Sequence, residues 1–305
     1  MRVLHIDTGR EMRGGQWQVL YLLERLAAAG HHVTLMARAG SPLYRKAKAQ
    51  ALDVRPATVV SMPELSWDAD IVHAHDARGH TLAALAALRP VVVSRRVAFP
   101  LKTHFLSRWK YGRAVRYIAV SEYVKARLAA GGIAEDRIDV VYDGVPLGAA
   151  ASGGNRVIAL AGKGVPLAKA AAARAGVELH FPGDLARELP EAAALVYITE
   201  EEGLGSGALL AMAAGVPVIA SRIGGLKEIL EDGETGLLVD NTPEAIATAI
   251  TRLLGDASLR ARLGAAGRRA VQERFTVERM VQATLAVYHQ VLPCSNPPSR
   301  FSPDC

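Results

Sequence analysis

The sequence of 305 residues is poor in cysteine, in aromatic residues and in long apolar runs. Its two cysteines, Cys294 and Cys305, lie close to the C-terminus, so no disulfide framework holds the body of the chain. That usage suits a reducing compartment, and we expect a cytoplasmic protein. The longest uncharged stretch, residues 203–221, is broken by glycines and a proline, which argues against a membrane span.

The composition that remains is that of a globular α/β protein. Hydrophobic residues make up 50% of the chain and aromatic residues only 5%, so the core must come mainly from Ala, Val, Leu and Ile. The length predicts two domains at roughly 150 residues each. The net charge of +6 suits an anionic substrate, a membrane surface or nucleic acid. The N-terminus has no apolar stretch of signal-peptide length, so we expect none.

Short apolar runs alternate with segments of helical periodicity through the first half. Residues 1–7 predict a buried strand, and 16–29 predict a helix that ends at Gly30. Strands that alternate with helices indicate a parallel sheet covered by helices on both faces. The further elements predicted are strands at 33–37, 71–73, 91–94, 117–120 and 138–142, and helices at 81–88 and 121–130.

A second series of strands and helices follows an Ala/Gly/Ser-rich linker. The fold expected is α/β, with two Rossmann-like parallel-sheet domains that face a central cleft. Parallel sheets bind ligands beyond the carboxyl ends of their strands, so this cleft is the expected site. The boundaries predicted are an N-terminal domain at 1–145, a linker at 146–156, a C-terminal domain at 157–292 whose final helix is a candidate to return to the N-terminal domain, and a disordered tail at 293–305.

One loop of the second half is the best candidate for gripping a ligand. A strand ends in three glutamates, and the segment Glu202-Gly-Leu-Gly205 then opens a helix. Free amides at a helix start bind anions, and glycines let a phosphate come close. A carboxylate beside them suits neutral hydroxyls, as on a sugar. The alternative is a solvated loop with a tight turn, which an isolated glycine-rich turn usually is.

The wider pattern resembles glycosyltransferase family four, whose members are retaining, nucleotide-sugar-dependent enzymes of the GT-B fold. The resemblance covers residues 1 to about 292 in family order, and it implies sugar transfer to an acceptor such as a cell-envelope glycan or glycolipid, without a metal or other cofactor. The motifs that carry it are Glu202–Gly205, 211–221, Gly224-Gly225 with Glu228, and Asp232-Gly233 with 236–239 in the second half, and Gly14-Gly15, 30–33, 70–75, 119–121 and 142–145 in the first.

The resemblance also implies roles for individual residues. Glu202 matches the glutamate that contacts the transferred sugar near its reacting carbon. Gly203, Leu204 and Gly205 match the backbone beside the donor's sugar and phosphates, and Gly15 matches the glycine that faces the diphosphate. Lys163 matches the phosphate-neutralising lysine; a cation and helix-start amides stabilise a leaving diphosphate.

Three departures from the family are visible. The second glutamate of the Glu, seven residues, Glu motif is Leu210 here, and leucine cannot accept hydrogen bonds from a ribose. The C-terminal domain is shortened by about one βα unit, since 157–180 predicts only one strand–helix passage. The loop after the strand at 91–94 has Arg95 and Arg96 where the family often has a histidine; these arginines suit an acceptor phosphate or the diphosphate, or are simply solvated.

Histidines gather at the end of the strand at 71–73. His73 and His75 are two apart and therefore face the same side of a strand, so a metal pair is conceivable, although further ligands at suitable spacing are lacking. The resemblance instead makes His75 a catalytic cleft residue, with Asp76 on the acceptor side and His73 packed in the strand. We therefore expect no metal.

The stretch 95–116 carries seven basic residues and no acid, interleaved with four aromatic residues. A helical surface that is both basic and aromatic suits an anionic membrane. The stretch therefore predicts a peripheral position at the inner side of the membrane. The alternative is an exposed helix whose aromatic side chains pack inward. We expect no nucleic acid partner, since no binding module is recognisable.

Three functions remain open at this point. The first is a retaining glycosyltransferase with Glu202, His75 and the arginines in the cleft. The second is a degenerate GT-B protein that binds a ligand or partner without catalysis, as Leu210 suggests. The third is a sugar-nucleotide epimerase of the same fold, which needs additional acid/base residues in the cleft.

Overall fold

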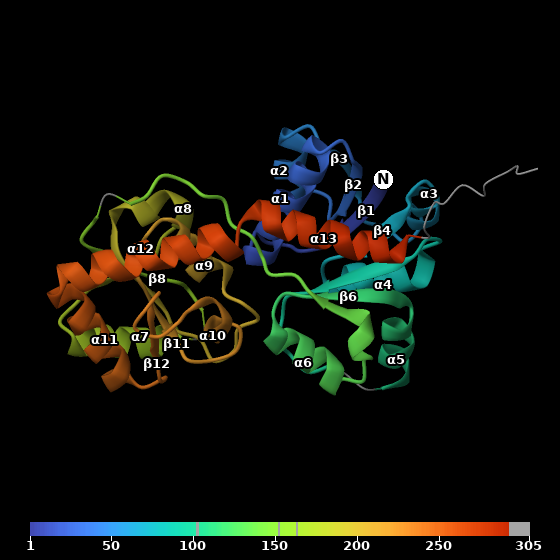
Figure 1. The fold of residues 1–305 in the computed structure, drawn as a ribbon. Coiled ribbons are helices and arrows are strands. Elements are labelled where there is room, and N and C mark those ends of the chain that lie inside the picture. The colour runs from blue at the N-terminus through green and yellow to red at the C-terminus, as the bar shows by residue number, and fades with distance from the viewer. Residues whose placement is uncertain (102–103, 152, 163, 293–305) are drawn as a thin grey trace, which may run out of the picture.

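The computed structural model describes residues 1–101, 104–151, 153–162 and 164–292, and it shows two lobes, each built on a parallel sheet. Figure 1 shows the lobes side by side, with the N-terminal half of the chain in one and the C-terminal half in the other. The expected α/β class with two parallel sheets is confirmed. The tail at 293–305, with both cysteines, lies outside the described residues, as does Lys163.

The N-terminal lobe holds seven strands in the order β3-β2-β1-β4-β5-β6-β7, all paired in parallel. Because the strand order reverses between β1 and β4, the carboxyl ends of these two strands form a crevice. The strands are β1 (Arg2–Asp7), β2 (His32–Ala37), β3 (Asp53–Pro56), β4 (Ile71–Ala74), β5 (Val91–Arg95), β6 (Ala114–Ala119) and β7 (Ile138–Val140).

Helices connect these strands, and two of them begin with side-chain caps that matter below. The carboxylate of Asp76 caps α4, and the hydroxyl of Ser121 caps α6. The sequence analysis missed β3, α2 and α3. Strand β3 gave no signal because it is a short edge strand, mostly exposed, without an apolar pattern. The helices are α1 (Gly14–Ala28), α2 (Pro42–Ala49), α3 (Met62–Trp67), α4 (Ala77–Ala86), α5 (Phe105–Gly112) and α6 (Glu122–Ala130).

The C-terminal lobe holds five parallel strands in the order β12-β11-β10-β8-β9. A single helix, α7, separates β8 from β9, as the short spacing at 157–180 predicts. The strands are β8 (Arg156–Ala159), β9 (Leu179–His180), β10 (Ala192–Tyr197), β11 (Val218–Ser221) and β12 (Leu237–Val239). The helices are α7 (Val165–Arg174), α8 (Leu185–Glu188), α9 (Ser206–Ala213), α10 (Leu226–Ile229), α11 (Pro243–Gly255), α12 (Ala257–Arg274) and α13 (Val277–Val291).

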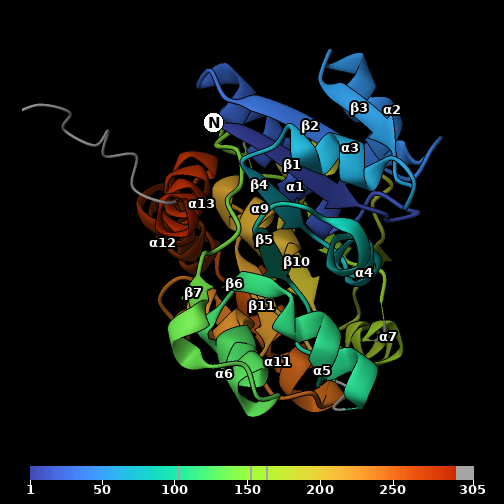
Figure 2. The ribbon, with the colours of Figure 1, turned by 90° about the vertical axis from the view of Figure 1, so that its right-hand side faces the viewer.

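The last helix returns to the N-terminal lobe. In Figure 1, α12 lies on the C-terminal lobe and α13 continues from it across the other lobe, where it packs against α1 and β6. Figure 2 shows both helices on the same flank of the molecule. Val287 and Tyr288 are buried in one apolar cluster with side chains of α1. The two lobes are thus joined twice, by the chain at 141–155 and by α13.

The two segments that join the lobes, the linking chain and the start of α13, contact each other at Gly144. A Cβ atom there would lie 2.4 Å from the carbonyl oxygen of Thr276, the residue that caps α13. The Gly144 amide also donates to the Gln18 side chain at 3.1 Å. Only glycine fits between these backbones.

We therefore predict that Gly144→Ala destabilises the protein by about 1–3 kcal/mol, since an added methyl group forces the backbones apart. The matched control is Gly148→Ala in the same linker, where an added Cβ meets nothing within 4 Å. Urea unfolding of both variants measures the difference. Equal stability of the two variants would show that the Gly144 contact is not tight in solution.

Candidate active site

The two lobes meet where the loop at 202–205 touches the loop after β5. A Cβ atom on Gly203 would lie 2.2 Å from the carbonyl oxygen of Arg96, so the close approach requires glycine. The Gly203 carbonyl accepts a hydrogen bond of 2.6 Å from the Ser121 hydroxyl of the N-terminal lobe. The structure therefore brings Gly203 and Arg96, two predicted site residues from different lobes, into direct contact.

Glu202 follows β10 and folds back over its own loop. Its Oε1 accepts hydrogen bonds from the amides of Gly203 at 2.9 Å and Leu204 at 3.4 Å, and its Oε2 accepts one from the Tyr197 hydroxyl. Burial and the adjacent Glu202 carboxylate hold the pKa of Tyr197 well above its ordinary value, so the phenol remains a donor. These three donors fix the half-buried carboxylate at the junction of the lobes.

The start of α9 faces the glycine pair of the N-terminal lobe. Gly205 has a φ angle of 109°, a conformation that favours glycine, and it turns the chain into the helix. A Cβ atom on Gly14 would lie 2.2 Å from the Ser206 hydroxyl oxygen, and one on Gly15 would lie 3.6 Å from Cδ of Arg96. A helix start and a guanidinium group thus border the same junction, and both favour a bound anion.

Leu210 takes part in packing one turn further along α9. Its side chain is half-buried and lies against the large apolar cluster that includes Leu209 and Met212. A ribose hydroxyl therefore finds no carboxylate at this position.

Arg96 forms the most buried ion pair recorded among the described residues. Its Nε donates to Oδ1 of Asp143 at 3.1 Å, and the two side chains are only 15% and 9% exposed. Burial raises the pKa of Asp143 above its ordinary value, and the nearby guanidinium opposes that rise. Asp143 follows β7 in the chain segment that leads to the second lobe. The ion pair therefore connects the loop of Arg96 to the segment that joins the lobes.

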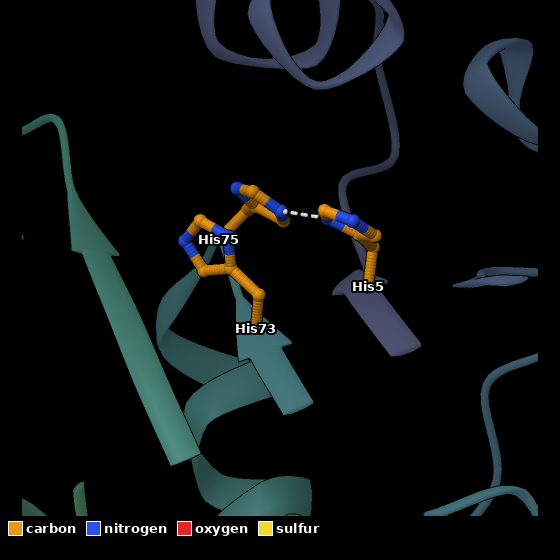
Figure 3. A group of neighbouring side chains, drawn as sticks. All are labelled: His5, His73 and His75. Carbon is orange, nitrogen blue, oxygen red and sulfur yellow. Dashed lines mark hydrogen bonds between the residues drawn. The ribbon is translucent and has the colours of Figure 1, made fainter. Parts of the chain in front are cut away.

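Three histidines gather at the carboxyl ends of the neighbouring strands β1 and β4 (Figure 3), and one of them, His75, contacts Arg96. His5 comes from β1, while His73 and His75 come from the end of β4. The sequence analysis singled out the last two and missed His5, because the pairing of β1 with β4 that sets His5 against His73 is a long-range contact. One nitrogen of each ring lies within 4.8 Å of the others, so the three could hold a metal ion only after the hydrogen bonds described next are broken.

The hydrogen bonds of the cluster assign its protons. A guanidinium is always protonated and only donates, so the 3.3 Å contact from Arg96 makes Nδ1 of His75 an acceptor. His75 then carries its proton on Nε2 and donates it to Nδ1 of His5 at 2.9 Å. His5 in turn carries its proton on Nε2, a buried atom without a partner in the described structure. His73 is occupied by Tyr288 at 2.5 Å and Ser94 at 2.8 Å.

The remaining N-terminal candidates line one pocket of about 420 Å³ with Gly15, His75 and Arg96. Asp76 is occupied: Oδ2 accepts from the Thr8 hydroxyl at 2.6 Å, and Oδ1 accepts from the amide of Gly79 at 2.6 Å as the cap of α4. Arg95 donates to the carbonyl of Phe99 at 2.6 Å and shapes the pocket wall. Among the described candidates, Arg96 is therefore the cation at the junction.

The sequence analysis named Glu228 only as part of a motif, and the structure shows that it bonds to the N-terminal lobe. Its carboxylate accepts the amides of Glu122 at 2.9 Å and Tyr123 at 2.8 Å at the start of α6, and the Tyr142 hydroxyl at 3.0 Å. Burial and the adjacent carboxylate raise the pKa of Tyr142 to about 12. Glu228 thus fastens the C-terminal lobe to the N-terminal lobe beside the candidate site.

The buried histidines predict a loss of stability in mild acid. Burial lowers the pKa of His5 and of His80 to about 3, and it holds the pKa of His73 and His75 well below 6.5. As the pH falls through 6.5 the unfolded chain binds protons that the folded protein does not, so each such histidine lowers the free energy of unfolding by about 1.4 kcal/mol in total between pH 7.5 and 5.5. Urea unfolding at several pH values between 7.5 and 5.5 measures this slope.

The variant His5→Gln removes one of these four titrations, so its slope is expected to be about a quarter smaller than that of the wild type. A free energy of unfolding that stays constant over this pH range would mean that the folded protein protonates the cluster.

Two family models match the chain. The model "Glycosyltransferase Family 4" matches residues 12–148, and the model "Glycosyl transferases group 1" matches residues 125–256. Between them they span both lobes, including the junction at Arg96 and Gly203.

Sequence relatives are similar over part of the chain. N-acetyl-alpha-D-glucosaminyl L-malate synthase of Bacillus anthracis is 34% identical over 99 residues, which are 32% of this chain and 26% of that protein. D-inositol 3-phosphate glycosyltransferase of Acidothermus cellulolyticus is 41% identical over 114 residues, which are 37% of this chain and 25% of that protein. The chain thus spans about a quarter of the length of these curated relatives.

Solved structures are similar over nearly the whole chain. HepE of Anabaena, solved with UDP and glucose, has a TM-score of 0.82 at 16% identity over 95% of this chain and 100% of that one. A glycosyltransferase from Rickettsia africae has a TM-score of 0.77 at 17% identity over 96% and 99%. With the two parallel sheets, these likenesses establish the GT-B fold, and the family matches show that the chain belongs to glycosyltransferase family 4.

Proposed function

We propose that the protein is a retaining glycosyltransferase that moves a sugar from a nucleotide-sugar donor to an acceptor hydroxyl. The observation that carries this proposal is the contact between the loop at 202–205 and Arg96 across the two lobes. It sets a fixed carboxylate, a helix start and a buried cation around one junction. HepE, which shares the fold, has been solved with UDP-glucose, and that supports a nucleotide-sugar as the donor.

The reaction breaks the bond between the anomeric carbon and the donor's diphosphate, and it forms a bond from the acceptor oxygen on the same face. The leaving diphosphate takes up negative charge, which Arg96 and the start of α9 stabilise. An oxygen of the diphosphate takes the proton of the acceptor hydroxyl. Glu202 accepts hydrogen bonds from the sugar, and His75 orients Arg96 from behind.

Two further features of the proposal concern the substrates. The pocket of about 420 Å³ beside Arg96 belongs to the N-terminal lobe, and it receives the acceptor. A cell-envelope glycan or glycolipid is the acceptor class we favour, since one relative is named a phosphatidylinositol monomannoside mannosyltransferase and another a capsular polysaccharide glycosyltransferase. No metal is assigned to the reaction.

We predict that Glu202→Gln lowers transfer, and donor hydrolysis, by a factor of about 100 or more, as expected for a lost interaction with the transition state. Glutamine keeps the carbonyl oxygen that accepts from the Gly203 and Leu204 amides, so the loop is preserved. The matched control is Glu200→Gln, an exposed glutamate two residues earlier, which should keep wild-type rates. The measurement is product formation from a panel of uridine, guanosine and adenosine diphosphate sugars.

Calorimetry separates this proposal from a GT-B protein without catalysis. The enzyme should bind at least one of the three nucleoside diphosphates, and Glu202→Gln should bind it within about threefold of the wild type, because this carboxylate contacts the sugar. Wild-type transfer rates in Glu202→Gln would refute the assigned role. Binding of none of the three nucleotides would favour a degenerate site, and an isomerised donor without acceptor would favour an epimerase.

The basic stretch at 95–116 contains an exposed apolar surface that fits a membrane. Helix α5 has no buried residue; its Phe105 and Leu106 are 79% and 68% exposed, and Phe99 and Trp109 are exposed as well. Tyr111 packs inward against His80 and Tyr117, whereas Phe99, Phe105 and Trp109 remain exposed. No helix among the described residues is long and apolar enough to cross a membrane. We infer peripheral contact with anionic lipid next to the acceptor pocket, which shares Phe99 with this surface.

Sedimentation with vesicles of phosphatidylglycerol and phosphatidylcholine tests this contact. The wild type should bind and should be released by salt, because screening weakens the attraction of the basic side chains. The double variant Phe105→Ser with Trp109→Ser should bind about tenfold more weakly, since it removes the inserted apolar surface. The control is Trp67→Ser, which removes an exposed tryptophan of α3. Equal binding to pure phosphatidylcholine would contradict the electrostatic attraction.

A further inference from the structure

A second pocket, of about 480 Å³, opens at the carboxyl ends of β1, β2 and β3. Its walls combine apolar groups such as Pro56 and Leu82 with two arginines, Arg38 and Arg78. Neither the nucleotide-sugar site nor the membrane surface described above includes it. The question is what an apolar pocket with two cationic groups can bind.

The two arginines reach the pocket from separate elements. Arg38 directly follows β2, and Arg78 lies in the first turn of α4. Both side chains are exposed, and within the described part of the chain neither guanidinium forms an ion pair or a hydrogen bond. Two arginines near the same sheet are engaged instead: Arg55 pairs with Asp53, and Arg89 donates to the carbonyl of Trp67. Two unengaged guanidinium groups in one concave pocket suit an anion.

No acidic side chain of the pocket neutralises them. The nearest carboxylate in sequence, Asp76, is occupied by the amide and hydroxyl of Thr8 and by the amide of Gly79. The pocket therefore keeps a positive potential that a bound phosphate can use. Arginine forms paired hydrogen bonds with phosphate oxygens, and two arginines can hold one phosphate from two sides.

The second pocket shares a wall with the acceptor pocket. Thr8 lines the second pocket and donates to Asp76, which lines the first. Along α4, Ala77 borders the first pocket and Arg78 borders the second. A ligand held at Arg78 can therefore extend past the start of α4 toward His75 and Arg96.

We propose that this second pocket is an anionic subsite for the acceptor, in which Arg38 and Arg78 bind a phosphate carried by a polyol or sugar. The apolar wall of Pro56 and Leu82 contacts the carbon skeleton, while the acceptor's reacting hydroxyl reaches the pocket beside Arg96. This subsite rests on the proposed glycosyltransferase activity, but its binding step requires no donor.

Arginine labelling tests the subsite without any activity. Phenylglyoxal modifies accessible guanidinium groups, and mass spectrometry measures the rate at each site. Inorganic phosphate or inositol monophosphate should slow labelling of Arg38 and Arg78 by about tenfold near saturation, while sodium chloride of equal ionic strength should not. Arg45, an exposed arginine of α2, is the internal control and should react at the same rate in all solutions. Equal labelling of Arg38 and Arg78 with and without both phosphate probes would overturn the proposal.

Calorimetry on variants supplies the second arm. The double variant Arg38→Gln with Arg78→Gln should bind inositol monophosphate about a hundredfold more weakly, because two charge-assisted contacts are lost. Arg45→Gln should bind it as the wild type does, and unphosphorylated inositol should bind both variants equally weakly. Equal affinity of the double variant and Arg45→Gln would also overturn the proposal. Tighter binding of glycerophosphoinositol than of the monoester would identify a lipid headgroup as the phosphate source, and the reverse would identify a soluble acceptor.

Donor hydrolysis distinguishes a failure of the subsite from a failure of the proposed function. Hydrolysis of the nucleotide-sugar should be the same in the wild type and in the double variant, since neither arginine touches the donor site. If the phosphate probes protect the arginines while no donor is hydrolysed or transferred, the subsite stands and the glycosyltransferase proposal falls. If donor turnover is seen but labelling is unprotected, the subsite alone falls.

Discussion

The buried pair of Arg96 and Asp143 is the interaction on which the geometry of the site depends. A buried charge is tolerated only when it is paired, and here the partner stands in the chain segment that leads to the second lobe. The pair fixes the loop after β5, whose carbonyl at Arg96 then meets Gly203. The ion pair within the N-terminal lobe thus holds the loop after β5 where it meets the loop at 202–205 of the C-terminal lobe.

The same guanidinium also sets the protonation of the histidines behind it. Because Arg96 can only donate, His75 must accept at Nδ1. His75 therefore carries its proton on Nε2 and donates a hydrogen bond to His5. Burial keeps all three rings neutral, so the cluster adds no positive charge to the cleft. The charge available to an incoming diphosphate is therefore that of Arg96, shared with Asp143, together with the amides at the start of α9. In the function we propose, the donor's diphosphate competes with Asp143 for one cation, which couples donor binding to the segment that joins the lobes.

The elements that the sequence predicted are those with local signatures. Apolar runs of strand length and helices with glycine stops revealed both sheets, and the loop at 202–205 was found by its glycines and carboxylate. What the sequence did not predict depends on contacts between distant residues. His5 belongs to the cluster only because β1 pairs with β4, and the pocket of Arg38 and Arg78 exists only because β2 ends and α4 begins at the same edge of the sheet. Asp76 lines the pocket beside Arg96, but its use as a helix cap was not anticipated.

Leu210 determines which groups of the proposed donor can form polar contacts with the site. Its side chain packs with the core of the C-terminal lobe, so the ribose gains no carboxylate contact there. In the function we propose, affinity for the donor then depends on the sugar contact at Glu202 and on the diphosphate contacts at Arg96 and α9. Contacts of the second kind are electrostatic and weaken with salt. They also recognise a diphosphate without reading the base. In the reaction we propose, a site of this composition discriminates sugars at Glu202 more strongly than it discriminates nucleosides, so sugar specificity lies in the loop at 202–205 and acceptor specificity in the two pockets of the N-terminal lobe.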